Sequence, residues 1–339
     1  GLAADMAWSA VLDRLAVLDR PAARRIEQGG AVDVRLRMSD PANGVRFVRL
    51  IGRGDTPGVF RGLLLPAGAA PKGGARLIER EAALADAVAS GEIAAFYQPV
   101  VDLRTRRLVG FEALARWRRP EEGVLNPDDF LPLAVRLGLL ADVGDQVRAA
   151  ALDELARWRD AGRGPVSVSV NATASELVRP GFAEALAQRA AASGAPAGTF
   201  KVEISETEVM GDPDACARAM GVLSDGGVAL LLDDFGTGYS SLARLDRLPF
   251  DAIKIDQYFV RHLTADESAR TIVGSVVSLA RNFGMSVVAE GVESEAAAAA
   301  LIELGCEQAQ GFLFAGALAP ADAELAVREG LPGRFAAPA

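Results

Sequence analysis

Two adjacent aspartates, Asp233 and Asp234, follow three leucines in the stretch LLLDDFGTGYSSL at residues 230–242. The leucines are typical of a buried strand, so the two carboxylates stand at the end of an apolar segment. Two like charges side by side are costly to bury unless a cation neutralises them. The stretch therefore predicts a cation at this point of the fold.

The same arrangement, a polar residue after a short apolar run, recurs in other segments. The residues concerned are Glu112, Asn171, Glu203 and Glu206, Asp233 and Asp234, Lys254 and Asp256, and Glu290 and Glu293, and Gln310 is expected at the start of a further segment. Any single acid of this kind is typical of a helix cap or a solvated loop. Six segments that each end in such a residue favour a different explanation. Their ends would meet at one shared rim of the fold.

An all-oxygen set of Asp, Glu and Asn side chains suits Mg²⁺, Mn²⁺ or Ca²⁺. The single histidine, His262, lies beyond its strand, and the two cysteines have no metal-type spacing, which argues against zinc. Two metals about 3.5–4 Å apart that share a carboxylate are the usual arrangement for phosphoester hydrolysis. Adjacent aspartates at one strand end supply such a bridge and a second ligand.

The elements that must position these groups alternate between strands and helices from residue 94 onward. Strand-like segments are expected at 94–103, 107–117, 166–173, 200–208, 229–236, 252–259, 286–293 and 310–314. Helical patterns separate most of them, at 144–161, 181–192, 213–226, 265–284 and 293–304. This order predicts an α/β fold, an irregular (β/α)8 TIM-like barrel whose first two strands form a hairpin. Reactive groups of such barrels lie at the C-terminal strand ends.

The first part of the chain has a different pattern. Residues 7–28 are expected to form a helix, and three stretches of period-two alternation then predict an antiparallel meander. This α+β module resembles the C-terminal half of a PAS sensor domain; a small dimerising β-module is the alternative. We predict a PAS-like module at 1–67, a linker at 68–77 and the large domain at 78–339, with a helix at 76–92 leading into it.

Composition excludes some classes of function. The 339 residues carry a net charge of −9, which argues against binding DNA or RNA polymers. Cys216 and Cys306 are expected to be reduced thiols in the cytoplasm, and no apolar run reaches the roughly 18 residues that a membrane helix needs. Because the sequence begins at Gly1, we expect a fragment of a longer protein, so upstream segments and membrane attachment through them stay open.

The motifs EALARW, DDFGTGYSSL, KID, AEGVE and QGF, in this order, resemble the EAL domain of cyclic di-GMP phosphodiesterases. The resemblance covers roughly residues 78–330. It implies hydrolysis of cyclic di-GMP to linear pGpG with two Mg²⁺ or Mn²⁺ ions and no organic cofactor. In this hydrolysis, water attacks phosphorus in line with the departing 3′-oxygen.

The resemblance also implies roles for single residues. Ligands of one metal are Glu112, Asn171, Glu203 and Asp233, and those around the second are Asp233, Asp234, Asp256 and Glu290. Lys254 matches the lysine that holds the attacking water, and Glu206 and Glu293 match residues that steady the substrate and the glycine loop of Gly236, Thr237 and Gly238. The substrate contacts would be Gln98, Leu114, Arg116, Gln310, Phe312 and Glu293.

Simpler interpretations exist for two of these contacts: a surface ion pair for Arg116 and core packing for Phe312. Two positions depart from the family pattern, Val135 in place of a usual glutamate and Ala317 in place of a common proline. Neither is a predicted metal ligand.

Three hypotheses of function follow. The first is an active phosphodiesterase, a homodimer regulated by its N-terminal module. The second is a non-catalytic receptor that binds cyclic di-GMP and signals through a partner. The third is an unrelated barrel metallohydrolase. The complete set of acids and the intact DDFGTG loop favour the first.

Overall fold

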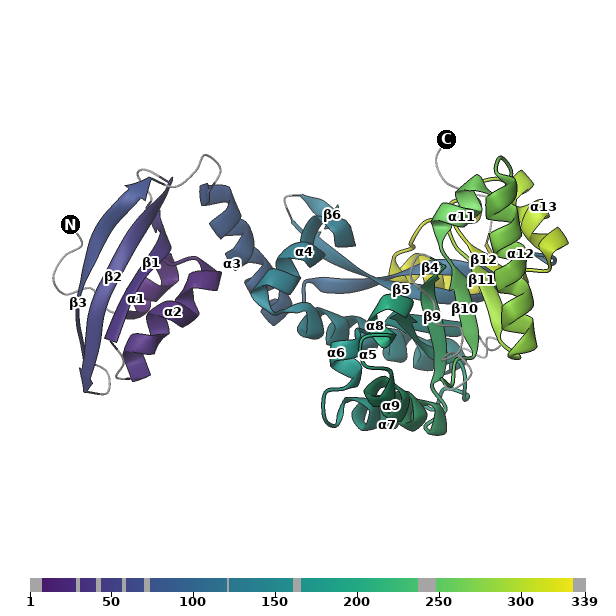
Figure 1. The fold of residues 1–339 in the computed structure, drawn as a ribbon, viewed down its shortest axis with the longest axis horizontal. Helices are drawn as coiled ribbons and strands as arrows, with labels where there is room; N and C mark the ends of the chain where they lie inside the picture. The colour runs from purple at the N-terminus through teal and green to yellow at the C-terminus, as the bar shows by residue number, and fades with distance from the viewer. Residues whose placement is uncertain are drawn as a thin grey trace. The chain divides into compact units, whose positions relative to one another are not determined.

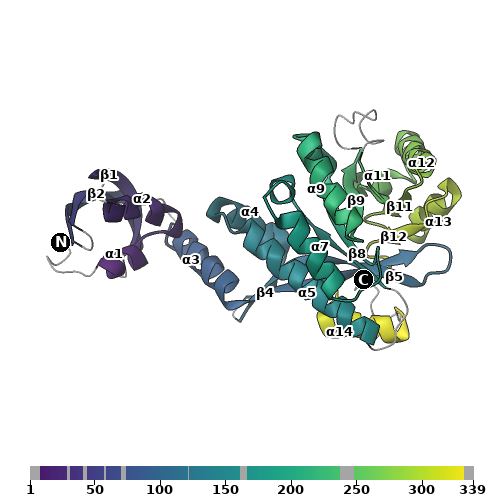
Figure 2. The same cartoon turned by 90° about the horizontal axis from the view of Figure 1, so that it is seen from below.

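The computed structural model describes residues 8–28, 31–40, 44–56, 59–69, 74–120, 122–160, 166–236 and 248–331. The chain divides into two compact units. One unit comprises residues 1–93 and 117–143, and the other comprises residues 94–116 and 144–339. Figures 1 and 2 show the ribbon from two sides.

The first unit begins with short helices and a meander. The helices are α1 (Trp8–Arg14) and α2 (Arg20–Arg24), with 3-10 turns at Val17–Asp19 and Arg25–Gln28. The strands β1 (Ala31–Asp40), β2 (Gly44–Thr56) and β3 (Val59–Ala69) pair antiparallel in that order, which confirms the predicted meander. Val32, Leu36, Val48 and Leu50 of the sheet pack with Leu12 into one apolar core.

The prediction of one continuous helix over 7–28 was wrong. The backbone is extended at Ala16 (φ −54°, ψ 140°), where the Ala16 amide donates to the carbonyl of Arg37 and Leu15 forms a bridge to Met38. Pairing with β1 therefore takes the place of helical hydrogen bonds at this point.

Helix α3 (Gly74–Ser90) follows, while residues 70–73 lie outside the described part of the chain. The same unit holds strand β6 (Gly123–Leu125) and helix α4 (Pro127–Leu137). A capping box of Asn126 and Asp129 starts α4, and Gly138 ends it at a φ of 70°. The PAS-like character of the module and the predicted domain boundaries stay predictions.

The second unit is built on a closed barrel. Its strands are β4 (Ile93–Asp102), β5 (Leu108–Arg119), β7 (Ser167–Asn171), β8 (Phe200–Ser205), β9 (Ala229–Phe235), β10 (Ala252–Ile255), β11 (Ser286–Ala289) and β12 (Gln308–Gln310). They lie in the order β4-β12-β11-β10-β9-β8-β7-β5, and β5 closes the ring by pairing with β4. Strand β4 runs antiparallel to β12, and the successive pairs from β5 through β12 are parallel. The predicted irregular TIM-like barrel is confirmed.

Helices lie around this barrel (Figure 2). They are α5 (Leu140–Asp160), α6 (Ala174–Leu177), α7 (Phe182–Ala192), α8 (Glu206–Val209), α9 (Pro213–Asp225), α11 (Gln257–His262), α12 (Glu267–Asn282), α13 (Glu295–Leu304) and α14 (Pro320–Glu329). The strands β7 to β11 are buried over most of their length, as expected where both faces of a parallel sheet are covered. Among the described residues, no helix is both long and apolar enough to cross a membrane.

The predicted eighth strand at 310–314 was misplaced. Strand β12 covers Gln308–Gln310, so Gln310 ends this strand and does not start it. Gly311 has a φ of 153°, and a Cβ there would lie 2.3 Å from the backbone nitrogen and oxygen of Val292. The backbone at this point packs directly against the backbone of Val292, whose amide donates to the Gln310 carbonyl at 3.0 Å. This close backbone approach requires glycine and ends the strand.

Candidate active site

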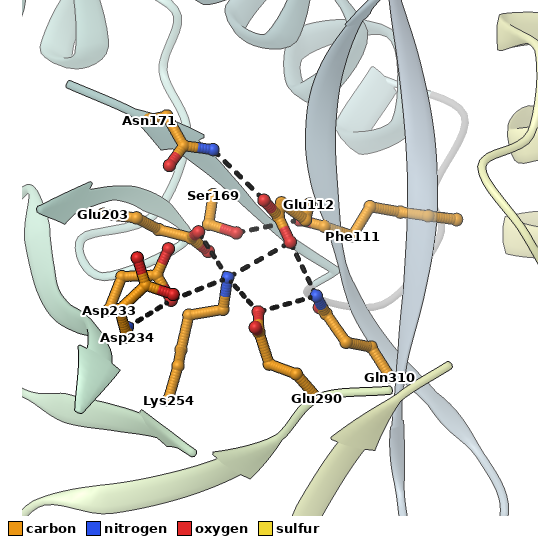
Figure 3. A network of polar contacts seen from close by, with 10 residues as sticks. All are labelled: Phe111, Glu112, Ser169, Asn171, Glu203, Asp233, Asp234, Lys254, Glu290 and Gln310. Atoms are coloured by element: carbon orange, nitrogen blue, oxygen red, sulfur yellow. Dashed lines mark hydrogen bonds and ion pairs between the residues drawn. The ribbon is translucent and has the colours of Figure 1, made fainter. Parts of the chain in front are cut away.

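The C-terminal rim of the parallel strands brings together most of the predicted polar residues. Figure 3 shows Glu112 of β5, Asn171 of β7, Glu203 of β8, Asp233 and Asp234 of β9, Lys254 of β10, Glu290 after β11 and Gln310 of β12 with their side chains converging. Except for the aspartate pair, each of these residues lies in a different strand or directly follows one. The parallel register makes these strand ends neighbours, as the pairing of Asn171 with Glu203 illustrates.

The ammonium group of Lys254 lies at the centre of this group, with 1% of the side chain exposed. Its Nζ atom is 2.6 Å from Glu203, 2.6 Å from Glu290, 3.1 Å from Glu112 and 3.5 Å from Asp233. One cation thus faces four carboxylates in a buried place. A single ammonium cannot neutralise four negative charges, so additional positive charge would stabilise the rim.

Amide side chains hold the Glu112 carboxylate from two sides. Asn171 donates from Nδ2 to Glu112 at 3.1 Å, and Gln310 donates from Nε2 to Glu112 at 2.6 Å and to Glu290 at 3.1 Å (Figure 3). The Oε1 atom of Gln310 is buried and has no hydrogen-bond partner within the described residues. Gln310 therefore orients two of the acids besides having a free acceptor.

The end of β9 has an unusual backbone. Asp234 has a φ of 56°, a left-handed conformation that is uncommon for residues other than glycine. Its amide donates to the carboxylate of Asp233 at 3.0 Å. Gly236 follows with a φ of 98°. This local conformation brings two successive side chains of one strand to the same rim, where regular alternation would point them to opposite faces.

Burial and crowding shift the pKa values of these acids in different directions. Burial and the neighbouring Glu112 raise the pKa of Glu203 well above its usual value. Burial also raises the pKa of Glu290, to about 8. Burial opposes ionisation of Glu112 too, but Lys254 and hydrogen bonds from Gln310 and Asn171 lower its pKa overall. The acids around Lys254 are therefore more stable with bound protons or cations than when all of them are ionised and unneutralised.

A divalent metal fits the donor set. Asp233, Asp234 and Glu290 each offer a carboxylate oxygen, and these three atoms lie within 4.8 Å of one another. Burial and the neighbouring Asp233 and Asp256 raise the pKa of Asp234, although the Lys254 ammonium opposes this shift. Carboxylate and amide oxygens, with neither histidine nor cysteine among them, suit Mg²⁺ or Mn²⁺.

Three further predicted residues follow the ends of β8, β10 and β11. Glu206 is 2% exposed, and its carboxylate accepts a hydrogen bond from the Gly236 amide at 3.3 Å. Asp256 is the N-cap of α11 and accepts from the Tyr258 amide at 2.8 Å. Glu293 is half-exposed and pairs with Arg261 of α11 at 3.0 Å.

Of the predicted substrate contacts, Gln310 lies within the group of acids around Lys254. The other contacts have different surroundings. Gln98 of β4 and Leu114 of β5 are half-buried. The guanidinium of Arg116 lies over the Phe96 ring, 5.9 Å from its centroid. Phe312 is 55% exposed, so its ring is not a core residue. The predicted loop residues Thr237 and Gly238 lie outside the described part of the chain.

The strand register gives Gln98 a defined direction. Val100 pairs with Gln310, so both side chains point to the same face, and Gln98 precedes Val100 by two residues on β4. Because β4 runs antiparallel, this step leads past the C-terminal end of β12, toward the rim.

One polar residue next to the site was missed by the sequence analysis. Arg148 of α5 is 1% exposed and donates to the backbone carbonyl of Asn171 at 3.2 Å. A signal was present: Arg148 follows Gly144 and precedes Leu152 at helical spacing, on the face where apolar residues are expected.

Known proteins resemble the second unit and the segments before it. The family model described as EAL domain matches residues 81–317. An uncharacterized protein of Mycobacterium tuberculosis is 41% identical over 219 residues, which are 64% of this chain and 35% of that protein. A protein of Pseudomonas aeruginosa named as a cyclic di-GMP phosphodiesterase is 35% identical over 228 residues, which are 67% of this chain and 39% of that protein.

A solved structure is similar as well. It is titled as the PaMucR phosphodiesterase in a c-di-GMP complex and superimposes with a TM-score of 0.69 at 34% identity. The match covers 72% of this chain and 99% of that chain. The two curated relatives are much longer than the matched segment, so this chain spans somewhat over a third of their length.

Proposed function

The chain belongs to the EAL domain family, and on that premise we propose that it hydrolyses cyclic di-GMP to the linear dinucleotide pGpG. The observation that carries the proposal is the buried Lys254 ammonium, surrounded by four carboxylates at the rim of the barrel. The proposal is also supported by two similar proteins that are named as phosphodiesterases.

The reaction replaces one phosphodiester bond. The oxygen of a water molecule bonds to phosphorus, the bond from phosphorus to the 3′-oxygen breaks, and a proton from the water ends on that 3′-oxygen. The product is a linear dinucleotide with a 5′-phosphate.

Residues of the rim have distinct tasks in this proposal. Glu112, Asn171, Glu203, Asp233, Asp234, Asp256 and Glu290 would hold two Mg²⁺ or Mn²⁺ ions. When bound, such ions polarise the phosphodiester and lower the pKa of the attacking water. The Lys254 ammonium would orient that water. Burial opposes its positive charge, but the neighbouring carboxylates raise its pKa overall, so the group stays protonated. Gln310 would keep Glu112 and Glu290 in place through its two hydrogen bonds.

Substrate contacts are proposed for residues away from Lys254. Arg116 suits a phosphate, and the exposed Phe312 ring suits the face of a base. Gln98 would meet the same ligand from β4, and Leu114 and Glu293 would line its site. Glu206 would steady the glycine loop through its contact with the Gly236 amide.

The test is product formation. The chain is incubated with cyclic di-GMP and Mn²⁺ or Mg²⁺, beside Glu112→Ala and beside Glu184→Ala, which removes an exposed acid on α7. We expect pGpG from the wild type and from Glu184→Ala, and none from Glu112→Ala. Binding of intact cyclic di-GMP without product would contradict hydrolysis and make the chain a receptor.

We also propose that the N-terminal module regulates a cytoplasmic homodimer. Support comes from contacts within the first unit: Arg37 of β1 pairs with Glu81 of α3 at 3.0 Å, and Arg136 of α4 lies 3.6 Å from Glu81. The buried free thiols of Cys216 and Cys306 suit a reducing compartment. If deletion of residues 1–75 changes neither the rate nor the oligomeric state measured by light scattering, the regulatory role is wrong.

A further inference from the structure

Arg148 is a buried cation outside the group of acids around Lys254. It lies on α5 beside the buried Val147, Ala151 and Leu152, with 1% of its surface exposed. Burial of an arginine is costly unless its charge and donors are satisfied. Gly144 makes the space for it, because a Cβ at that position would lie 2.8 Å from Nη1 of Arg148. Helix α5 is thus shaped around this side chain.

The contacts of Arg148 join three elements of the second unit. Nη2 donates to Asp145 at 2.8 Å and to Glu176 of α6 at 2.6 Å. Nη1 donates to the backbone carbonyl of Asn171, the last residue of β7, at 3.2 Å. The two carboxylates already neutralise the guanidinium charge. The bond to the carbonyl therefore serves geometry, since it holds the end of β7.

Glu176, which accepts from Arg148, also contacts Thr173 in the turn after β7. Its Oε2 atom accepts from the amide of Thr173 at 3.0 Å and from the Thr173 hydroxyl at 3.0 Å. Arg148 thus fixes the residue before Ala172 directly and the residue after it through Glu176. The backbone is therefore held at Asn171 itself and again at Thr173, two residues later.

The side chain of Asn171 points from this fixed backbone into the rim (Figure 3). Its Nδ2 donates to Glu112 at 3.1 Å, so the amide presents Oδ1 as its acceptor to a cation. We infer that Arg148 is a positioning residue that sets the orientation of Asn171 as a metal ligand. This inference rests on the metal site of the proposed function.

The expected size of the effect follows from metal sites in general. Groups that orient a ligand without touching the metal typically change affinity or activity about 10–100-fold when they are mutated. A planar guanidinium can donate to a carbonyl and two carboxylates at once, whereas a lysine ammonium is a compact point charge on a flexible stem. Arg148→Lys therefore keeps the charge and loses the geometry.

The experiment measures Mn²⁺ affinity of the full chain by titration calorimetry, with the unfolding midpoint of the metal-free protein recorded for each variant. We expect Arg148→Lys to bind Mn²⁺ about 10–100-fold more weakly at a similar midpoint. The matched control is Arg189→Lys, because Arg189 is exposed and lines the same surface cavity as Arg148. It is expected to bind like the wild type.

A double variant tests whether Arg148 acts through Asn171. In an Asn171→Ala background the ligand is gone, so Arg148→Lys is expected to weaken Mn²⁺ binding no further. If Arg148→Lys fails to fold, Glu176→Gln replaces it, since this variant weakens the hold on the guanidinium and keeps the side-chain shape. It is then expected to weaken Mn²⁺ binding several-fold.

Three results would overturn the inference: wild-type affinity in Arg148→Lys or in its replacement Glu176→Gln, losses that multiply in the double variant, or no Mn²⁺ binding by the wild type. A wild type that binds Mn²⁺ without hydrolysing cyclic di-GMP contradicts the proposed function only. The affinity measurements then still decide the role of Arg148.

Discussion

Each of the two units contains a cluster of charges around buried acids, and the two clusters differ in the balance of positive and negative charge. In the barrel, one ammonium, Lys254, lies within 3.5 Å of four carboxylates. In the first unit, Arg37 pairs with Asp19 at 3.2 Å and with Glu81 at 3.0 Å, and Arg136 adds a second cation at 3.6 Å from Glu81. The first cluster has a surplus of negative charge, whereas the second has two charges of each sign.

This difference separates a site that needs a ligand from one that is complete. Around Lys254, burial raises the pKa values of Glu203 and Glu290, because too little positive charge is present for all the acids to ionise. Around Arg37, burial opposes the charge, but hydrogen bonds to Asp19 and Glu81 raise its pKa overall. A surplus of buried charge, more than burial itself, marks the rim as the place for a divalent cation.

The largest expected effect comes from Asp233→Asn. We expect the rate of cyclic di-GMP hydrolysis to fall about a thousandfold, because a lost metal ligand removes several kcal/mol of charge stabilisation in the transition state. The metal-free variant is expected to be at least as stable as the wild type, since one of two adjacent like charges is gone. Product chromatography and thermal unfolding measure the two quantities.

Asp225→Asn is the matched control, because it removes the same charge from an exposed position at the end of α9, the helix before β9. It is expected to keep the wild-type rate. A strongly destabilised Asp233→Asn would contradict the comparison, since it would make Asp233 a structural residue.

The next effect concerns the central cation. Lys254→Met leaves the buried acids without their counterion, and we expect the metal-free protein to lose about 3 kcal/mol of stability. Because Mn²⁺ supplies the missing positive charge, it is expected to restore much of this loss. Denaturant unfolding with and without Mn²⁺ measures both terms.

Lys201→Met provides the control, since Lys201 is the other lysine of the barrel strands and its electrostatic interaction reaches Glu203 but not the other three acids. Its stability is expected to change equally with and without Mn²⁺. A loss in Lys254→Met that Mn²⁺ does not reduce would argue against a cation site at this rim.

Much of the rim could be predicted from the sequence, for a physical reason. Parallel strands of a closed barrel end at one edge, so an acid that follows each apolar run must meet the others there. Glu112, Asn171, Glu203, Asp233 and Glu290 converge on this ground alone. The order of strands and helices likewise predicts the barrel.

The features that escaped prediction depend on contacts between distant segments. Helix formation ends at Ala16 because of β1, and β12 ends at Gln310 because Gly311 packs on Val292. The left-handed conformation of Asp234 and the pairing of Arg148 with Asn171 arise in the same way. Local patterns of hydrophobicity can mark Arg148 as a residue on a buried helix face, but they do not give the distant partners of these contacts.

The smallest expected effect tests the balanced cluster of the first unit. Glu81→Gln removes one of two anions from a buried position beside Arg37, whose side chain is 20% exposed. We expect a loss of about 2 kcal/mol in the unfolding of this unit, below the 3–5 kcal/mol of fully buried pairs, because water partly reaches Arg37. Hydrolysis by the folded protein is expected to stay within tenfold of the wild-type rate.

Glu79→Gln, at an exposed position of the same helix, should change neither the stability nor the rate. A thousandfold loss of activity in Glu81→Gln at unchanged stability would reverse the comparison, because a charge-balanced cluster would then behave as part of the catalytic machinery.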